Sequence, residues 1–166
     1  MKPQDLLVAI RLFIAKGKKY SYAELGSSLA ISASEAHAAV QRLNECYLFD
    51  ALTNSIRKPA LEEFLVHGLQ YTFPVSAGKM ARGVLTGFSA SFFKNEFSIN
   101  QSTEVFIWPF SSGAHRGISI KPLYRTVPQT CLQDSKIYHW LVVIDMLRMN
   151  RAREREVALS HLKKLI

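Results

Sequence analysis

Two short patterns, eleven positions apart, constrain the fold of this chain more than any other feature. Ser21 is followed three residues later by Glu24, and Ser32 is followed at the same spacing by Glu35. A serine and a glutamate so placed exchange side-chain-to-backbone hydrogen bonds at a helix N-terminus, where the first turn leaves amide groups without partners. Two helix starts this close together, within residues 21–43, predict a helix-turn-helix.

The second helix of this pair is the expected DNA-reading element. In a helix-turn-helix it enters the major groove, where each base pair displays a distinct pattern of donors and acceptors. Gln41 can pair with adenine and Arg42 with guanine, and His37 can donate to an acceptor or contact a phosphate. We assign Ser34 to the DNA backbone. The competing interpretation is a surface helix or a protein-binding face.

Basic residues flank this helix pair on both sides. Residues 48–58 alternate apolar and polar side chains around turn-forming residues, which predicts a short hairpin or wing. Phosphate contacts in such proteins come from cations at helix and wing ends. The candidates are Lys18, Lys19, Arg57 and Lys58. Ordinary solvated charge is an equal alternative for each of them.

The charge balance favours a polyanionic partner. The chain has 21 Lys and Arg against 13 Asp and Glu, a net charge of +8. Residues 1–67 carry a net charge of +1 and residues 68–166 a net charge of +7. Nucleic acid fits this excess better than an anionic membrane surface does. The later segment must therefore supply phosphate contacts, or the N-terminal charges must be sorted onto one face.

The remaining pattern indicates an α+β protein with three segments. We expect a winged helix-turn-helix over residues 1–68, a hairpin and loop region over 69–125, and helices over 126–166. The middle segment is rich in aromatic residues, which we interpret as core rather than as an effector pocket. Its expected strands are Gln70–Phe73, Val105–Trp108 and Gly117–Ile120, with residues 75–103 largely irregular.

An apolar stripe at helical spacing marks the C-terminal segment. It consists of Ile137, Trp140, Leu141, Ile144 and Leu147. We expect the helices from Trp140 to Leu165 to supply much of a homodimer interface. A dimer would place two reading helices in successive major grooves of a palindromic site, about 34 Å apart.

Several function classes are not expected. The five histidines lack metal-ligand spacing and no nucleophile motif is present, so we expect no metal, no cofactor and no enzyme activity. If Gly78-Lys79 is aligned with the Gly-Lys of a phosphate-binding P-loop, the motif requires Gly at position 73 and Ser or Thr at position 80, where this chain has Phe73 and Met80. A backbone turn over Gly78–Gly83 is therefore favoured over a nucleotide site. Cys46 and Cys131 are expected to be reduced, buried thiols. Without a signal peptide or an apolar run of spanning length, the expected location is cytoplasmic, with no membrane contact.

Residues 22–48 resemble the helix-turn-helix of winged-helix bacterial regulators of the MarR-like superfamily. The resemblance rests on Glu24-Leu25-Gly26, on Leu29-Ala30-Ile31-Ser32 and on Val40 followed by Leu43. It covers roughly residues 5–58, about a third of the chain. It implies a dimeric repressor that binds double-stranded promoter DNA. The alternative is an antitoxin-like or phage-defence accessory protein that binds a protein partner and also represses its own promoter.

Overall fold

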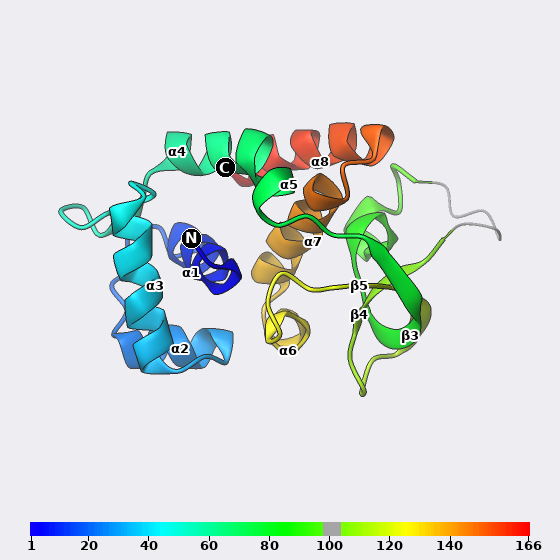
Figure 1. The fold of residues 1–166 in the computed structure, drawn as a ribbon, viewed down its shortest axis with the longest axis horizontal. Coiled ribbons are helices and arrows are strands. Elements are labelled where there is room, and N and C mark those ends of the chain that lie inside the picture. Colours follow the sequence, from blue (N-terminus) through cyan, green and yellow to red (C-terminus); the bar gives the residue numbers. More distant parts are fainter. Residues whose placement is uncertain (98–103) are drawn as a thin grey trace. The chain divides into compact units, whose positions relative to one another are not determined.

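The protein is a mixed α+β structure, described by a computed structural model for residues 1–97 and 104–166 (Figure 1). The chain divides into two compact units. Unit 1 comprises residues 1–65 and 123–138, and unit 2 comprises residues 66–122 and 139–166. The unit boundaries at residues 65 and 122 each lie three residues from a boundary expected from the sequence, at residues 68 and 125. The last segment differs, because residues 126–138 join the N-terminal residues in unit 1.

Unit 1 is built on three N-terminal helices and a hairpin. The elements are α1 (Pro3–Ile14), α2 (Tyr22–Leu29), α3 (Ala33–Glu45), β1 (Phe49–Asp50), β2 (Ser55–Ile56), α4 (Lys58–Glu63) and α6 (Val127–Gln133). Strands β1 and β2 pair antiparallel, with Phe49 opposite Ile56. The predicted helix pair and hairpin are confirmed. The core is apolar, since Leu6, Ile10, Leu29 and Leu43 are fully buried.

Unit 2 is built on a small closed sheet with helices. Its elements are α5 (Leu69–Thr72), β3 (Ala77–Leu85), β4 (Phe106–Pro109), β5 (His115–Ile120), most of α7 (Ser135–Met149) and α8 (Ala152–Leu165). Strand β3 pairs antiparallel with both β4 and β5, and β4 pairs parallel with β5. Glycines permit this tight closure, because a Cβ at Gly83 would overlap the carbonyl of Trp108 and one at Gly117 would overlap that of Val105.

A buried carboxylate ties the sheet of unit 2 to α7. Asp145 accepts hydrogen bonds from the Thr86 hydroxyl and the Trp108 indole, and its other oxygen lies 2.7 Å from the Arg148 guanidinium. Arg148 also donates to the carbonyl of Phe73, at 2.8 Å. Asp145 and Trp108 are 1% and 0% exposed. Burial raises the pKa of Asp145, and the Arg148 charge and the three donors oppose that rise by stabilising the carboxylate.

Three expectations for the C-terminal two thirds, and one for Cys46, are wrong. Residues 70–73 are not a strand, because residues 69–72 form α5, which continues a helical run from α4 through a π turn at Phe64–Gly68. Residues 77–85, expected to be irregular, form β3, which includes the stretch interpreted as a Gly-punctuated turn. The part of that expectation covering residues 98–103 lies outside the described residues. Cys46 is exposed, whereas Cys131 is buried as expected.

The apolar stripe of α7 is also reassigned. Its five members are at most 3% exposed, so they are core and leave no face for a second chain. Most middle-segment aromatics are core as well, Phe93, Phe106 and Trp108 being fully buried, whereas Tyr71 is exposed. No helix in the described part of the chain combines the length and the apolar character needed to cross a bilayer.

Candidate nucleic-acid interface

Both capping boxes form as the sequence predicts. The Ser21 amide donates to the Glu24 carboxylate at 2.8 Å, and the Glu24 amide donates to the Ser21 hydroxyl at 3.2 Å. At α3 the corresponding distances are 3.4 Å and 3.1 Å. The hydroxyl of Tyr124 also donates to Glu35, at 2.9 Å, and this bond lowers the pKa of Glu35. The start of α3 is therefore fixed both by its own capping box and by Tyr124.

The turn between α2 and α3 is tight. Ala30, the residue that follows α2, has a left-handed backbone with φ of 53°, and the Ile31 amide donates to the Gly26 carbonyl at 3.0 Å. A Cβ at Gly26 would lie 2.7 Å from the Ile31 carbonyl oxygen, closer than real Cβ contacts. Gly26 therefore lets the chain reverse against α2, and this reversal sets the angle at which α3 leaves the turn.

An ion pair locks α3 onto α1. The Arg42 guanidinium grips Asp5 with two hydrogen bonds, from Nε at 2.9 Å and from Nη2 at 2.6 Å. The Asp5 side chain is fully buried and that of Arg42 is 25% exposed. The hydrogen bonds that Arg42 donates to Asp5 raise the pKa of Arg42. Two of the Arg42 donors, Nε and Nη2, are therefore engaged in holding two helices together, which argues against the assignment of Arg42 to guanine.

The opposite face of α3 carries a continuous polar stripe. Ala36, Ala39 and Leu43 are fully buried on the inner face of the helix. The outer face exposes Ser34, His37, Gln41 and Asn44, at positions i, i+3, i+7 and i+10. This spacing puts all four in one row along the helix. The first three were expected from the sequence. Asn44 was not, although the same spacing identifies it.

Neighbouring side chains hold His37 in place. The Tyr22 ring meets the His37 ring edge-on, with centroids 4.7 Å apart. On the other side the Gln41 amide nitrogen lies 3.4 Å from His37 Nε2. Tyr22 begins α2 and is 41% exposed, so it belongs to the same surface as the stripe. These contacts limit the rotamers of His37 and Gln41, which reduces the entropy lost when either binds a partner.

The predicted phosphate-binding cations occupy the edges of unit 1. Lys18 and Lys19 are exposed before α2, and the Lys18 ammonium lies 5.2 Å from the centre of the Tyr20 ring. Arg57 follows β2 and makes a loose ion pair with Asp50 at 3.8 Å. Lys58 is exposed as the first residue of α4. The structure thus leaves all four accessible to an anion.

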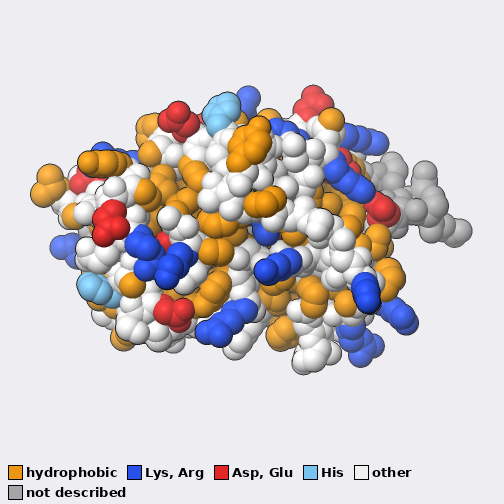
Figure 2. Space-filling view, viewed as in Figure 1, with side chains coloured by type: hydrophobic (Ala, Val, Ile, Leu, Met, Phe, Trp, Pro, Cys, Tyr) orange, Lys and Arg blue, Asp and Glu red, His pale blue; other side chains and the backbone are white. Residues whose placement is uncertain are grey.

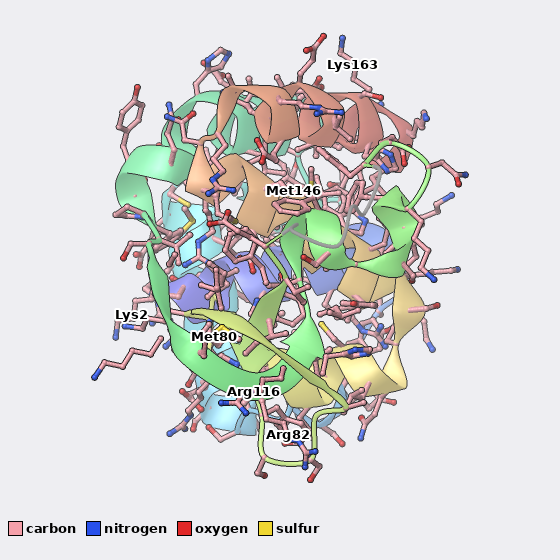
Figure 3. The ribbon with its side chains drawn as sticks, turned by 90° about the vertical axis from the view of Figure 1, so that its right-hand side faces the viewer. Lys2, Met80, Arg82, Arg116, Met146 and Lys163 are labelled. Atoms are coloured by element: carbon pink, nitrogen blue, oxygen red, sulfur yellow. The ribbon has the colours of Figure 1, made fainter. Side chains whose placement is uncertain are left out.

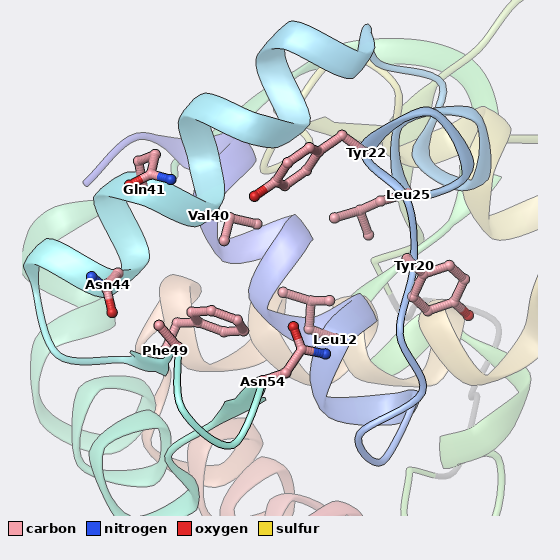
Figure 4. Close-up of a pocket in the computed structure, with 10 residues that line it drawn as sticks. Leu12, Tyr20, Tyr22, Leu25, Val40, Gln41, Asn44, Phe49 and Asn54 are labelled. Carbon is pink, nitrogen blue, oxygen red and sulfur yellow. The ribbon is translucent and has the colours of Figure 1, made fainter.

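A pocket of about 230 Å³ separates α3 from the hairpin (Figure 4). Its floor is apolar and buried, with Leu12, Leu25, Val40 and Phe49. Its rim is polar and uncharged, with Tyr20, Tyr22, Gln41, Asn44 and Asn54. Figure 4 shows Tyr22 and Val40 directed toward the same space. The amide side chains at this rim both donate and accept, as contacts to base edges and phosphate oxygens require.

The histidines do not assemble a metal centre in the described residues, where no group of three or more His, Cys, Asp or Glu side chains is placed to hold an ion. In unit 2, His139 and His161 form a pair with ring nitrogens 3.1 Å apart, and His161 lies 3.0 Å from the Glu96 carboxylate. Phe92 stacks on His139 with centroids 4.3 Å apart. Half-burial of His139, together with the charge of His161, lowers the pKa of His139.

Comparison with known proteins finds no matching family model, no matching curated protein and no matching solved structure.

Proposed function

We propose that the chain is a sequence-specific DNA-binding transcriptional regulator that reads the major groove with α3. The observation that supports this best is the division of α3 into two faces. One face is fixed to α1 and α2 by buried side chains and by the Asp5–Arg42 pair. The other presents an exposed row of hydrogen-bonding groups without acids, lysine or arginine, which is what discrimination among base pairs needs.

The roles of individual residues follow from their chemistry. Gln41 and Asn44 carry amides that can pair bidentately with adenine, and His37 can donate to an acceptor on a base edge. Ser34, at the start of the helix, suits a phosphate because helix N-termini favour anions. Lys18, Lys19, Arg57 and Lys58 would add cations around this row. The hairpin β1–β2 then takes the part of the wing in a winged helix-turn-helix of MarR-like type.

Regulation by blocking a promoter is the biological role that fits such a surface. The homodimer expected from the helices between Trp140 and Leu165 cannot use the apolar stripe of α7, since that stripe is buried. A palindromic operator therefore requires a dimer surface elsewhere on the chain. Sedimentation at micromolar concentration, with and without DNA, tests this point, and a monomer in both states would remove the homodimer from the proposal.

The reading of bases can be tested without knowing the operator. The full chain selects from a pool of random duplexes, and its affinity for the enriched sequence and for a random duplex is then measured over a salt series. We expect Gln41→Ala to weaken binding to the enriched sequence by about 1 to 3 kcal/mol and to relax preference at one base pair. Lys58→Ala should weaken binding to both duplexes alike and lower the salt slope.

Glu45→Gln is the matched control, because Glu45 is exposed on α3 but lies outside the polar row. It should leave base preference unchanged. A pool that yields no consensus, or a Gln41→Ala variant with unaltered preference, would overturn the assignment of α3 to the major groove.

A further inference from the structure

The small sheet of unit 2 has a surface with cations and no acids. Residues 66–95 and 105–122 contain no Asp or Glu. Strand β3 nevertheless exposes Lys79 and Arg82, and strand β5 exposes His115 and Arg116. Lys121, directly after β5, is also exposed. Figure 2 shows basic side chains over these strands, at the lower right, without an acidic neighbour. Within the described residues, none of the five takes part in an ion pair.

Two of these cations lie directly opposite each other on adjacent strands. Arg82 on β3 is the direct partner of Arg116 on β5 in the antiparallel register, so both side chains leave from the same face. Figure 3 shows them together at one end of the sheet. Like charges directly opposite each other destabilise a strand pair. A repulsive pair without a compensating carboxylate indicates a surface arranged for an anion rather than for stability.

The chemistry of the pair favours phosphate. Guanidinium groups form bidentate hydrogen bonds with phosphate oxygens, and paired strands hold two of them side by side at fixed spacing. An anionic membrane is a weaker match, because membrane-surface elements combine cations with several exposed apolar side chains. In the sheet itself Met80, at 58% exposure, is the single large apolar side chain exposed among the described residues.

We propose that this basic sheet surface, centred on Arg82 and Arg116, is a second DNA-binding site that grips the phosphate backbone without reading sequence. It goes beyond the base-reading role of α3 and does not require it. Unit 2 carries eleven basic and five acidic side chains, against ten and eight in unit 1. Unit 2 therefore supplies most of the net charge that binds the polymer, and α3 supplies the discrimination.

The test measures the affinity of the full chain for a random-sequence DNA duplex over a salt series. For B-form DNA each phosphate contact contributes about 0.9 to the slope of log affinity against log salt. The double variant Arg82→Gln/Arg116→Gln should lower that slope by about 2 and weaken binding at low salt. It should leave the preference for an enriched sequence over a random one unchanged, whereas Gln41→Ala changes that preference and leaves the random-duplex slope alone. The two proposals can therefore fail separately.

The matched control is Lys163→Gln/Lys164→Gln, which removes the same charge from exposed positions of α8, also in unit 2. Figure 3 shows Lys163 at the other end of the view from Arg82 and Arg116. This control should keep the wild-type slope. Equal loss in both double variants would mean that general charge, not this surface, drives binding, and an unchanged slope in the arginine variant would likewise overturn the proposal.

A second variant guards against loss of folding. Arg82→Glu places opposite charges across the strands, so its melting temperature should rise while its affinity for the random duplex falls. Both tryptophans of the chain, Trp108 and Trp140, lie in unit 2, so their fluorescence reports its folding. Stable Arg82→Glu protein that binds the duplex like wild type would contradict the proposal. Arginine-dependent binding to phosphatidylserine vesicles with none to DNA would replace it with a membrane site.

Discussion

Each unit buries one carboxylate against an arginine, but the two pairs differ in how far water reaches them. In unit 1 the Asp5 side chain is fully buried while its partner Arg42 is 25% exposed. In unit 2 the side chains of Asp145 and Arg148 are 1% and 4% exposed. Arg42 can therefore be solvated if its partner is removed, and Arg148 cannot. Removing the carboxylate should therefore destabilise unit 2 more than unit 1.

The largest predicted effect is at Asp145. Asp145→Ala leaves the Arg148 guanidinium buried without a counter-charge and removes the acceptor for Thr86 and Trp108. We expect a loss of about 3 to 5 kcal/mol of unfolding free energy, the usual result of breaking a buried ion pair on one side. Urea denaturation followed by tryptophan fluorescence measures it in unit 2. Glu156→Ala, an exposed acid on α8, is the control and should change stability by less than about 0.5 kcal/mol.

The corresponding change in unit 1 should cost less. We expect Asp5→Ala to lose about 2 kcal/mol, because water can reach the freed Arg42 side chain and recover part of the lost interaction. Helical circular dichroism in urea measures the loss, with Glu45→Ala as the control on an exposed site of α3. If Asp5→Ala costs as much as Asp145→Ala, solvent access does not distinguish the two pairs.

The contrast between the units also explains what the sequence could predict. The capping boxes and the hairpin of unit 1 depend on residues within a few positions of each other, so their patterns are visible along the chain. In unit 2 the decisive bonds join distant residues, such as Thr86 with Asp145 and Arg148 with the carbonyl of Phe73. No local pattern marks such partners. Strand β3 went unpredicted because its glycines, which favour turns locally, serve here for close strand approach.

The candidate interface was predictable to the same limited extent. Helical spacing identifies Ser34, His37 and Gln41 as one row, and the structure exposes all three. Arg42 was misassigned because its partner, Asp5, lies 37 positions away in a different helix. The α7 stripe was misassigned to a dimer surface because periodicity shows that a face is apolar but not what covers it.

The smallest predicted effect is a pH dependence that belongs to unit 2. Half-burial of His139 lowers its pKa, and the nearby His161 lowers it further. In the unfolded chain His139 titrates near its ordinary pKa of about 6.5. As the pH falls below that value, the unfolded state binds a proton that the folded state does not, so stability is lost on acidification. The hydrogen bond from His161 lowers the pKa of Glu96, so Glu96 stays ionised throughout this window.

We therefore expect the melting temperature of the wild type, followed by tryptophan fluorescence, to fall as the pH is lowered from about 7.5 to about 5.5. His139→Gln keeps a hydrogen-bonding side chain but cannot titrate, so its melting temperature should fall less over the same range. His115→Gln removes an exposed histidine from β5 and should follow the wild-type profile. Parallel profiles for wild type and His139→Gln would show that His139 binds protons equally in the folded and unfolded states, which would contradict a pKa lowered by burial.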